Sequence, residues 1–144
     1  MRRNFVLHYE TTIAAAHRLT KDVYTKKCAE HTHGHNLRIV FTIVATKLDE
    51  TDMVTDFGKL KDLAHQYDHR NLNDFFENPT SEVLAKHLAE EVFKMLPDAE
   101  YIGVTVWESD HSRVRYEIRN DDLTRLLNTC KQLDESLRRK ETSQ

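Results

Sequence analysis

The stretch that most constrains the fold is a long alternating run that follows three closely spaced histidines. In the strand predicted between Asn36 and Leu48, a large apolar or small side chain occupies every second position from Leu37 to Ala45. In an extended chain, residues two apart share a face, about 6.5–7 Å apart, so the run predicts a β-strand with one face in a core. His33 and His35 have the parity of that face. If the strand extends back to them, both imidazoles point toward apolar surroundings. The residues of this parity are Leu37, Ile39, Phe41, Ile43 and Ala45.

Imidazoles on an apolar face must be hydrogen-bonded or metal-bound, because unsatisfied buried polar atoms are costly. Three protein ligands of this kind suit Zn²⁺ and leave one position open for a substrate. His17, after a run of alanines, is the candidate third ligand, and Cys28 is a further ligand or a reactive thiolate. The plain alternative is that nine histidines in 144 residues cluster by chance, and that His17 is an ordinary satisfied residue.

Composition limits the class of protein. A chain of 144 residues is expected to form one domain with a real core. With 39% hydrophobic and 31% charged residues it has the composition of a soluble globular protein. A net charge of −3 gives no reason to expect nucleic acid or membrane partners. There is no apolar signal core or membrane-length run, and Cys28 and Cys130 form no disulfide framework, so we expect a cytoplasmic protein.

The other elements follow from periodicity and capping signals. Further strands are predicted over 4–11 and 101–108, with a hairpin turn at 109–112 leading into a last strand. A helix opens in Met53–Leu60 with Thr55 or Asp56 as its cap, and another starts at Asn78–Glu82 and runs to about residue 96. Residues 20–30 are predicted to form a polar loop, and 120–139 a terminal helix with a leucine stripe. Helices between strands without βαβ alternation indicate an α+β fold.

Two acidic positions are candidates for chemistry. Asp68 directly precedes His69, and a carboxylate beside an imidazole favours its protonated or correctly tautomerised form. The alternative is a polar cluster at a helix end, where a cationic histidine complements the dipole. Glu108 has the parity of the apolar positions in strand 101–108, so its carboxylate would end an apolar face. A solvated strand end is the alternative for Glu108.

The motifs form an ordered set along the chain, namely Ala-Ala-His17-Arg-Leu, Cys28, His33-Gly-His35-Asn, Met53-Val-Thr-Asp-Phe, Asp68-His69-Arg-Asn-Leu-Asn, Pro79-Thr-Ser-Glu and Val106-Trp-Glu108. With this set the chain resembles the 6-pyruvoyl-tetrahydropterin synthase family, including the 6-carboxy-5,6,7,8-tetrahydropterin synthases of queuosine biosynthesis. The resemblance implies a tunnelling fold, an antiparallel four-stranded sheet with two helices inserted after the second strand. It would occupy residues 1–119, with 120–144 as a C-terminal helical extension. Such subunits join through their sheets into barrels, so a homo-hexamer with active sites at subunit contacts is expected.

The resemblance also implies a metal site and a base. His17, His33 and His35 would ligate zinc, which would hold the side-chain hydroxyls of 7,8-dihydroneopterin triphosphate and increase their acidity. Cys28, as a thiolate, would be a general base at that side chain. The product would be 6-carboxy-5,6,7,8-tetrahydropterin, with release of acetaldehyde and triphosphate, so the chain would be a lyase acting on a small molecule.

Further roles are implied for the acidic and hydroxyl residues. Asp68 and His69 would be a second proton-transfer pair. Glu108 would anchor the pterin, because its two oxygens can accept paired N–H bonds from the pyrimidine edge. Thr80 and Ser81 would contact the ring. Four cations are available for the triphosphate, with no basis for choosing among them, namely Lys26, Lys27, Arg70 and Arg113.

One spacing departs from the family pattern and leaves the product open. Four residues separate Cys28 from His33, whereas the queuosine-type enzymes have three and the pyruvoyl-forming enzymes five. Glu30 and His31 lie in this segment, and some family members use a glutamate there for aldolase-like cleavage. The alternatives are therefore 6-pyruvoyl-tetrahydropterin, 6-hydroxymethyl-dihydropterin, or a non-catalytic zinc- or pterin-binding module.

Overall fold

The computed structural model describes residues 1–120 and the separate positions Lys131, Gln132, Glu135, Arg138 and Arg139. The strands are β1 (Phe5–His17), β2 (His33–Ala45), β3 (Arg70–Asn71), β4 (Tyr101–Ser109) and β5 (Ser112–Arg119). The helices are α1 (Lys26–Glu30), α2 (Phe57–His65) and α3 (Ser81–Met95), with a short 3-10 helix η1 (Leu72–Asp74). The predicted terminal helix and the extension that contains Cys130 lie beyond the continuous described part of the chain.

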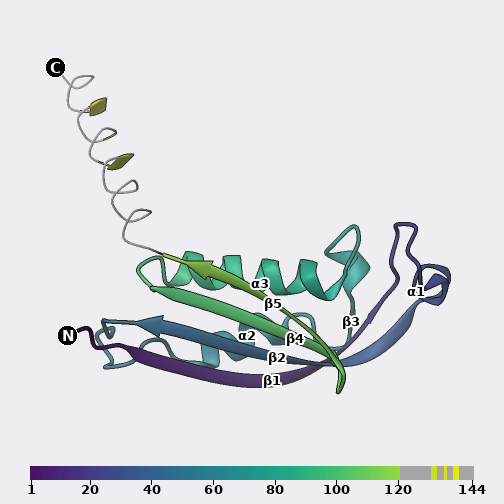
Figure 1. The fold of residues 1–144 in the computed structure, drawn as a ribbon, viewed down its shortest axis with the longest axis horizontal. Coiled ribbons are helices and arrows are strands. Elements are labelled where there is room, and N and C mark those ends of the chain that lie inside the picture. The colour runs from purple at the N-terminus through teal and green to yellow at the C-terminus, as the bar shows by residue number, and fades with distance from the viewer. Residues whose placement is uncertain (121–130, 133–134, 136–137, 140–144) are drawn as a thin grey trace.

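The sheet has the order β3-β1-β2-β4-β5 (Figure 1). The four long strands are antiparallel neighbours, and α2 and α3 come between β2 and β4 in the chain. The α+β class is as predicted, but the sheet is mixed and five-stranded, because β3 adds a short parallel pairing to the edge of β1. The backbone N–H of His69 donates to the carbonyl of Ala14 at 2.6 Å, and this bond holds the next two residues, which form β3, beside β1.

The core lies between the sheet and the helices α2 and α3. The predicted face of β2 is fully buried at Ile39, Phe41 and Ile43, each 0% exposed. Burying a side chain of this size contributes about 1.5–3 kcal/mol, so the alternation fixes which face of β2 turns inward. The helices and β4 complete the core with Leu60, Ala64, Leu84, Leu88, Val92, Ile102, Val104 and Val106.

Several predicted boundaries are wrong, and pairing between strands explains two of them. The strand expected over 4–11 continues to His17, and the one expected over 36–48 covers 33–45, because β1 and β2 stay paired from Phe5↔Ala45 to His17↔His33. The loop expected over 20–30 contains α1, none of whose five residues is buried. Without an apolar stripe, such a helix leaves no periodic signal in the sequence.

Both long helices begin within the segments where capping residues predict a helix start. The Asp56 carboxylate accepts a hydrogen bond from Gly58 N at 2.7 Å, so of the two predicted cap candidates Asp56 is the cap, and α2 begins at Phe57. Thr80 caps α3. Within the described part of the chain, no helix has both the length and the apolar character needed to cross a bilayer.

Candidate metal centre and active site

Three histidines meet at the end of the β1–β2 ladder. His17 and His33 are register partners, and His35 lies two residues further along β2. One nitrogen from each ring lies within 4.8 Å of the others, and the Nε2 atoms of His17 and His33 are 3.1 Å apart. His17 is only 6% exposed. The strand pairing therefore brings together, at one point, side chains that are 18 residues apart at most in the sequence.

The hydrogen bonds of these rings fit a metal ion. The Nδ1 of His17 lies 2.6 Å from the carbonyl of Pro79, and that of His33 lies 3.0 Å from the carbonyl of His31. Because a carbonyl only accepts, these contacts place the proton on Nδ1 and leave Nε2 as a bare lone pair. The Nε2 of His35 is buried and lacks a hydrogen-bond partner among the described residues. Three converging lone pairs suit a cation such as Zn²⁺, whose tetrahedral ligands at 2.0–2.1 Å lie roughly 3.3 Å apart.

The environment of His35 favours its neutral form. Burial lowers the pKa of His35, and the nearby imidazoles of His17 and His33 lower it further. The carboxylate of Glu108 raises it, with Oε1 at 3.8 Å from the His35 Nε2. The net effect on the pKa of His35 is a decrease, and a neutral imidazole is the form that binds a metal.

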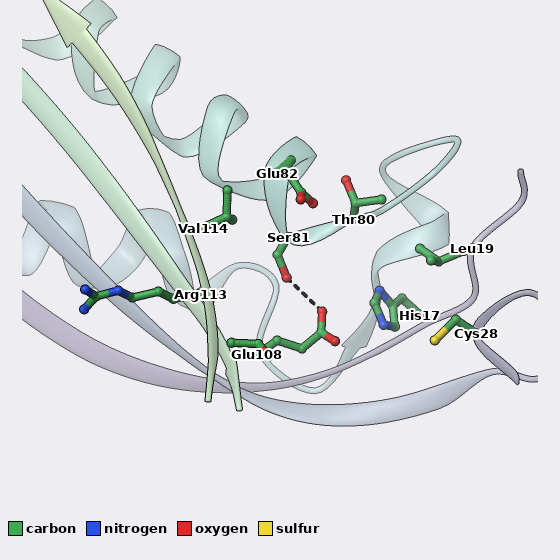
Figure 2. Close-up of a pocket in the computed structure, with 10 residues that line it drawn as sticks. His17, Leu19, Cys28, Thr80, Ser81, Glu82, Glu108, Arg113 and Val114 are labelled. Atoms are coloured by element: carbon green, nitrogen blue, oxygen red, sulfur yellow. Dashed lines mark hydrogen bonds between the residues drawn. The ribbon is translucent and has the colours of Figure 1, made fainter. Parts of the chain in front are cut away.

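A cavity of about 200 Å³ opens beside His17 (Figure 2). The Ser81 hydroxyl donates to Glu108 Oε2 at 2.9 Å, and both side chains line the cavity. Thr80 lines it too, but its hydroxyl accepts a hydrogen bond from Val83 N at 3.2 Å as the cap of α3. The hydroxyls of Thr80 and Ser81 are thus already engaged with the protein, and Ser81 holds the carboxylate of Glu108.

Cys28 lies on the other side of the same cavity. It belongs to α1, is half-buried, and in Figure 2 its sulfur is directed toward the imidazole of His17. The backbone N–H of Leu19 donates to the Cys28 carbonyl at 2.8 Å. This bond ties α1 to the segment that leaves β1, which places the thiol beside the histidine cluster.

Asp68 and His69 form a close pair near a second cavity. The carboxylate of Asp68 contacts His69 Nδ1 at 3.0 Å and accepts a hydrogen bond from Ala14 N at 2.8 Å. The bond from Ala14 lowers the pKa of Asp68, the hydrogen bond from His69 lowers it further, and partial desolvation opposes both. The side chain of His69 is 82% exposed. His69 and His35 line this second cavity, whereas Cys28 lines the first.

The predicted cations are distributed between the two cavities. Arg113 lines the Cys28 cavity and stacks over Trp107 at 4.5 Å, while Arg70 lines the His69 cavity. Lys26 is paired with Asp22, and Lys27 belongs to α1. Arg113 and Arg70 thus each border one of the two cavities.

The backbone groups that orient the site were not predicted from the sequence. The Pro79 carbonyl orients His17, and the peptide groups of Ala14 hold both Asp68 and His69. Pro79 is recognisable in the sequence as part of a helix start, but a carbonyl direction leaves no residue-type signal. Only the folded backbone supplies these partners.

Comparison with known proteins gives a consistent family. A family model described as 6-pyruvoyl tetrahydropterin synthase matches residues 6–119. A 6-carboxy-5,6,7,8-tetrahydropterin synthase from Bacillus subtilis is 30% identical over 106 residues, covering 67% of this chain and 71% of the relative. A dihydroneopterin monophosphate aldolase from Pyrococcus furiosus is 31% identical over 114 residues, covering 76% and 94%. These names indicate a tetrahydropterin synthase-type lyase.

Solved structures show the same fold. The 6-pyruvoyl tetrahydropterin synthase of Caenorhabditis elegans superposes with a TM-score of 0.60 at 23% identity, over 83% of this chain and 98% of that one. At this identity the likeness concerns the fold alone.

Proposed function

The chain belongs to the 6-pyruvoyl tetrahydropterin synthase family, and on that premise we propose that it converts 7,8-dihydroneopterin triphosphate and water to 6-carboxy-5,6,7,8-tetrahydropterin, acetaldehyde and triphosphate. We place this reaction in queuosine and 7-deazaguanine biosynthesis in the cytoplasm. The observation that carries the proposal is the convergence of three imidazole nitrogens within 4.8 Å beside a cavity that also holds Cys28 and Glu108. Relatives named for this reaction support the choice of product.

His17, His33 and His35 are the proposed zinc ligands. Zn²⁺ would supply Lewis acidity at the substrate's side-chain hydroxyls. The protein orients two of the rings through carbonyls at 2.6 and 3.0 Å, which fixes their tautomer independently of the metal. The third ring, His35, is kept neutral by the lowering of its pKa through burial.

Glu108 is the proposed anchor for the pterin ring. Its carboxylate can accept two N–H bonds from the 2-amino and N3 positions of the pyrimidine edge. The Ser81 hydroxyl holds Oε2 at 2.9 Å, so the carboxylate is oriented before the substrate enters. We assign Ser81 to this supporting contact and Thr80 to the cavity wall.

Cys28 and His69 are the proposed proton-transfer groups. The Cys28 thiol is half-buried beside His17, where the thiolate would remove a proton from the substrate side chain. Asp68 accepts from His69 Nδ1 at 3.0 Å, so the exposed Nε2 is the nitrogen free to exchange a proton. Because this ring is 82% exposed, it is accessible to a substrate bound outside its own subunit.

The separation of Cys28 and His69 supports an active site shared by two subunits. The two residues line different cavities of one chain. We propose that sheets join into barrels in a homo-hexamer, so that His69 of one copy completes the site of another. Co-expression tests this directly, because mixed assemblies of Cys28→Ala and His69→Ala subunits would regain part of the activity that each variant alone lacks. No recovery in purified mixed assemblies would contradict the sharing.

The product is the decisive measurement. Metal-replete protein should consume dihydroneopterin triphosphate, and mass spectrometry should show 6-carboxytetrahydropterin with acetaldehyde. A 6-pyruvoyl product without acetaldehyde would instead reassign the chain within its family, and lack of turnover would leave only a binding module. Normal turnover by both Cys28→Ala and His69→Ala would contradict the assigned residues.

A second candidate function is aldolase-like formation of 6-hydroxymethyl-dihydropterin. It is favoured by the Pyrococcus furiosus relative named dihydroneopterin monophosphate aldolase, and by Glu30, which lies in α1 with Cys28. Replacing Glu30 by Gln distinguishes the two. Loss of hydroxymethyl product in that variant would support the aldolase reaction, and unchanged carboxytetrahydropterin formation would support the first proposal.

A further inference from the structure

We infer that Asn73 is a positioning residue that fixes the metal ligand His17 relative to Cys28. The inference rests on the proposed metal centre and deepens it. The side-chain amide of Asn73 makes two bonds to the backbone of Arg18, the residue after His17. Its Oδ1 accepts from Arg18 N at 2.7 Å, and its Nδ2 donates to Arg18 O at 2.8 Å. One amide therefore replaces the strand partner that β1 loses at this point.

The position of Asn73 is fixed by its own contacts. It lies in η1 (Leu72–Asp74), directly after β3, and its backbone N–H donates to Asn71 Oδ1 at 3.0 Å. The neighbouring Leu72 is only 2% exposed. We call the two hydrogen bonds from Asn73 to Arg18 the clamp. Because the buried Leu72 and the pairing of β3 with β1 hold Asn73 in place, the clamp fixes the position of the Arg18 backbone.

Arg18 lies between the metal ligand His17 and Leu19, the residue that is bonded to Cys28. On one side is His17, whose Nδ1 meets the Pro79 carbonyl at 2.6 Å. On the other is Leu19, whose N–H donates to the Cys28 carbonyl at 2.8 Å. Successive residues of an extended segment turn their N–H and C=O groups to opposite sides. Arg18 can thus face Asn73 while its neighbours face the histidine cluster and α1.

Asn78 offers a matched control, because its side chain bonds the backbone two residues after Arg18. Its Oδ1 accepts from Thr20 N at 2.9 Å. An aspartate at position 78 would keep this acceptor. An aspartate at position 73 would keep the acceptor for Arg18 N but lose the donor, and would place a carboxylate oxygen against the Arg18 carbonyl. The two substitutions add the same charge, yet only the one at position 73 breaks the clamp.

The test measures Co²⁺ binding by its visible absorption in the full chain. Loss of a group that is hydrogen-bonded to a metal ligand typically weakens metal affinity 10- to 100-fold. Asn73 bonds the residue after the ligand, so Asn73→Asp should weaken Co²⁺ binding by about 10-fold, at the lower end of that range, and alter the band shape. Asn78→Asp should bind within about 2-fold of wild type, well below that range. If Asn73→Asp does not fold, Asn73→Gln, which moves the amide by one methylene, should show the same direction of change.

A cycle with His17→Ala separates positioning from general destabilisation. Once the ligand is absent, Asn73→Asp should produce no further loss of Co²⁺ affinity, and an equal loss in both backgrounds would overturn the inference. Equal binding by wild type and Asn73→Asp would also overturn it, while leaving the proposed function intact. Absence of Co²⁺ binding by the wild type would overturn the metal centre and the clamp together.

Discussion

The Nε2 atoms of His17 and His33 lie 3.1 Å apart, while the Nδ1 of each ring meets a backbone carbonyl. Two lone pairs facing one another at this distance repel unless a proton or a cation lies between them. The rings are held in place because the two residues are the last register partners of a ladder that runs from Phe5 to His17. The binding geometry is therefore built into the sheet, and the folded protein should gain stability from a metal.

Metal removal should lower the melting temperature. A ligand that binds only the folded state adds about 2.7 kcal/mol at 100 times its Kd, so adding Zn²⁺ to chelator-treated protein should raise the melting temperature in a dose-dependent way. His33→Ala should abolish this shift, and Cys28→Ala should keep it. A zinc-dependent shift of the same size in His33→Ala would contradict the assignment of the ligands.

The metal-free protein should lose stability in mild acid through His35. Its pKa is below the ordinary value of 6.5 because of burial, with His17 and His33 adding to the effect. Between the lowered value and 6.5 the unfolded chain binds more protons than the folded one, so stability falls as pH drops through this range. Urea denaturation at pH 5 and at pH 7.5 measures how much the free energy of unfolding differs between the two pH values. This difference should be smaller for His35→Asn than for wild type, and for the exposed control His111→Asn it should equal that of wild type. An unchanged pH dependence in His35→Asn would contradict this cause.

Ser81→Ala should weaken pterin binding. Its hydroxyl donates to the carboxylate of Glu108, and a hydrogen bond to a charged group contributes about 1.5–3 kcal/mol. We expect an affinity loss of about 10-fold, which corresponds to about 1.4 kcal/mol and lies just below that range, because water replaces part of the bond. Fluorescence titration with neopterin measures it, with Ser109→Ala as a control at the β4–β5 turn. Equal affinities of the two variants would show that Ser81 does not support Glu108.

His69 combines a proposed catalytic ring with a left-handed backbone. Its φ is 56°, a conformation that costs a non-glycine residue about 1–2 kcal/mol. His69→Gly and His69→Ala should both lose catalytic turnover, because both lack the imidazole. In urea denaturation the glycine variant should be the more stable of the two by about 1 kcal/mol. If alanine were equally well tolerated, the backbone at this position would not be under strain.

The sequence by itself determined the buried face of the sheet and the histidines on it. The alternation in β2 follows from the period of a strand, so it indicated both the buried face and the inward direction of His33 and His35. The cap Asp56 and the start of a helix within Asn78–Glu82 were equally predictable, because capping depends on one short polar side chain near a helix start. Residue type and position along the chain were also enough to indicate His17 as the third candidate ligand.

Only the tertiary structure decided how these pieces meet. It extended β1 to His17 through pairing with β2, added β3 at the edge, and placed Cys28 on a short helix that has no apolar stripe. It also put Cys28 and His69 at different cavities. The physical reason is that local patterns fix which way a side chain points, whereas the distance between two sites depends on backbone hydrogen bonds between distant segments. Those bonds join peptide groups that every residue type carries, and so they leave no mark in the sequence.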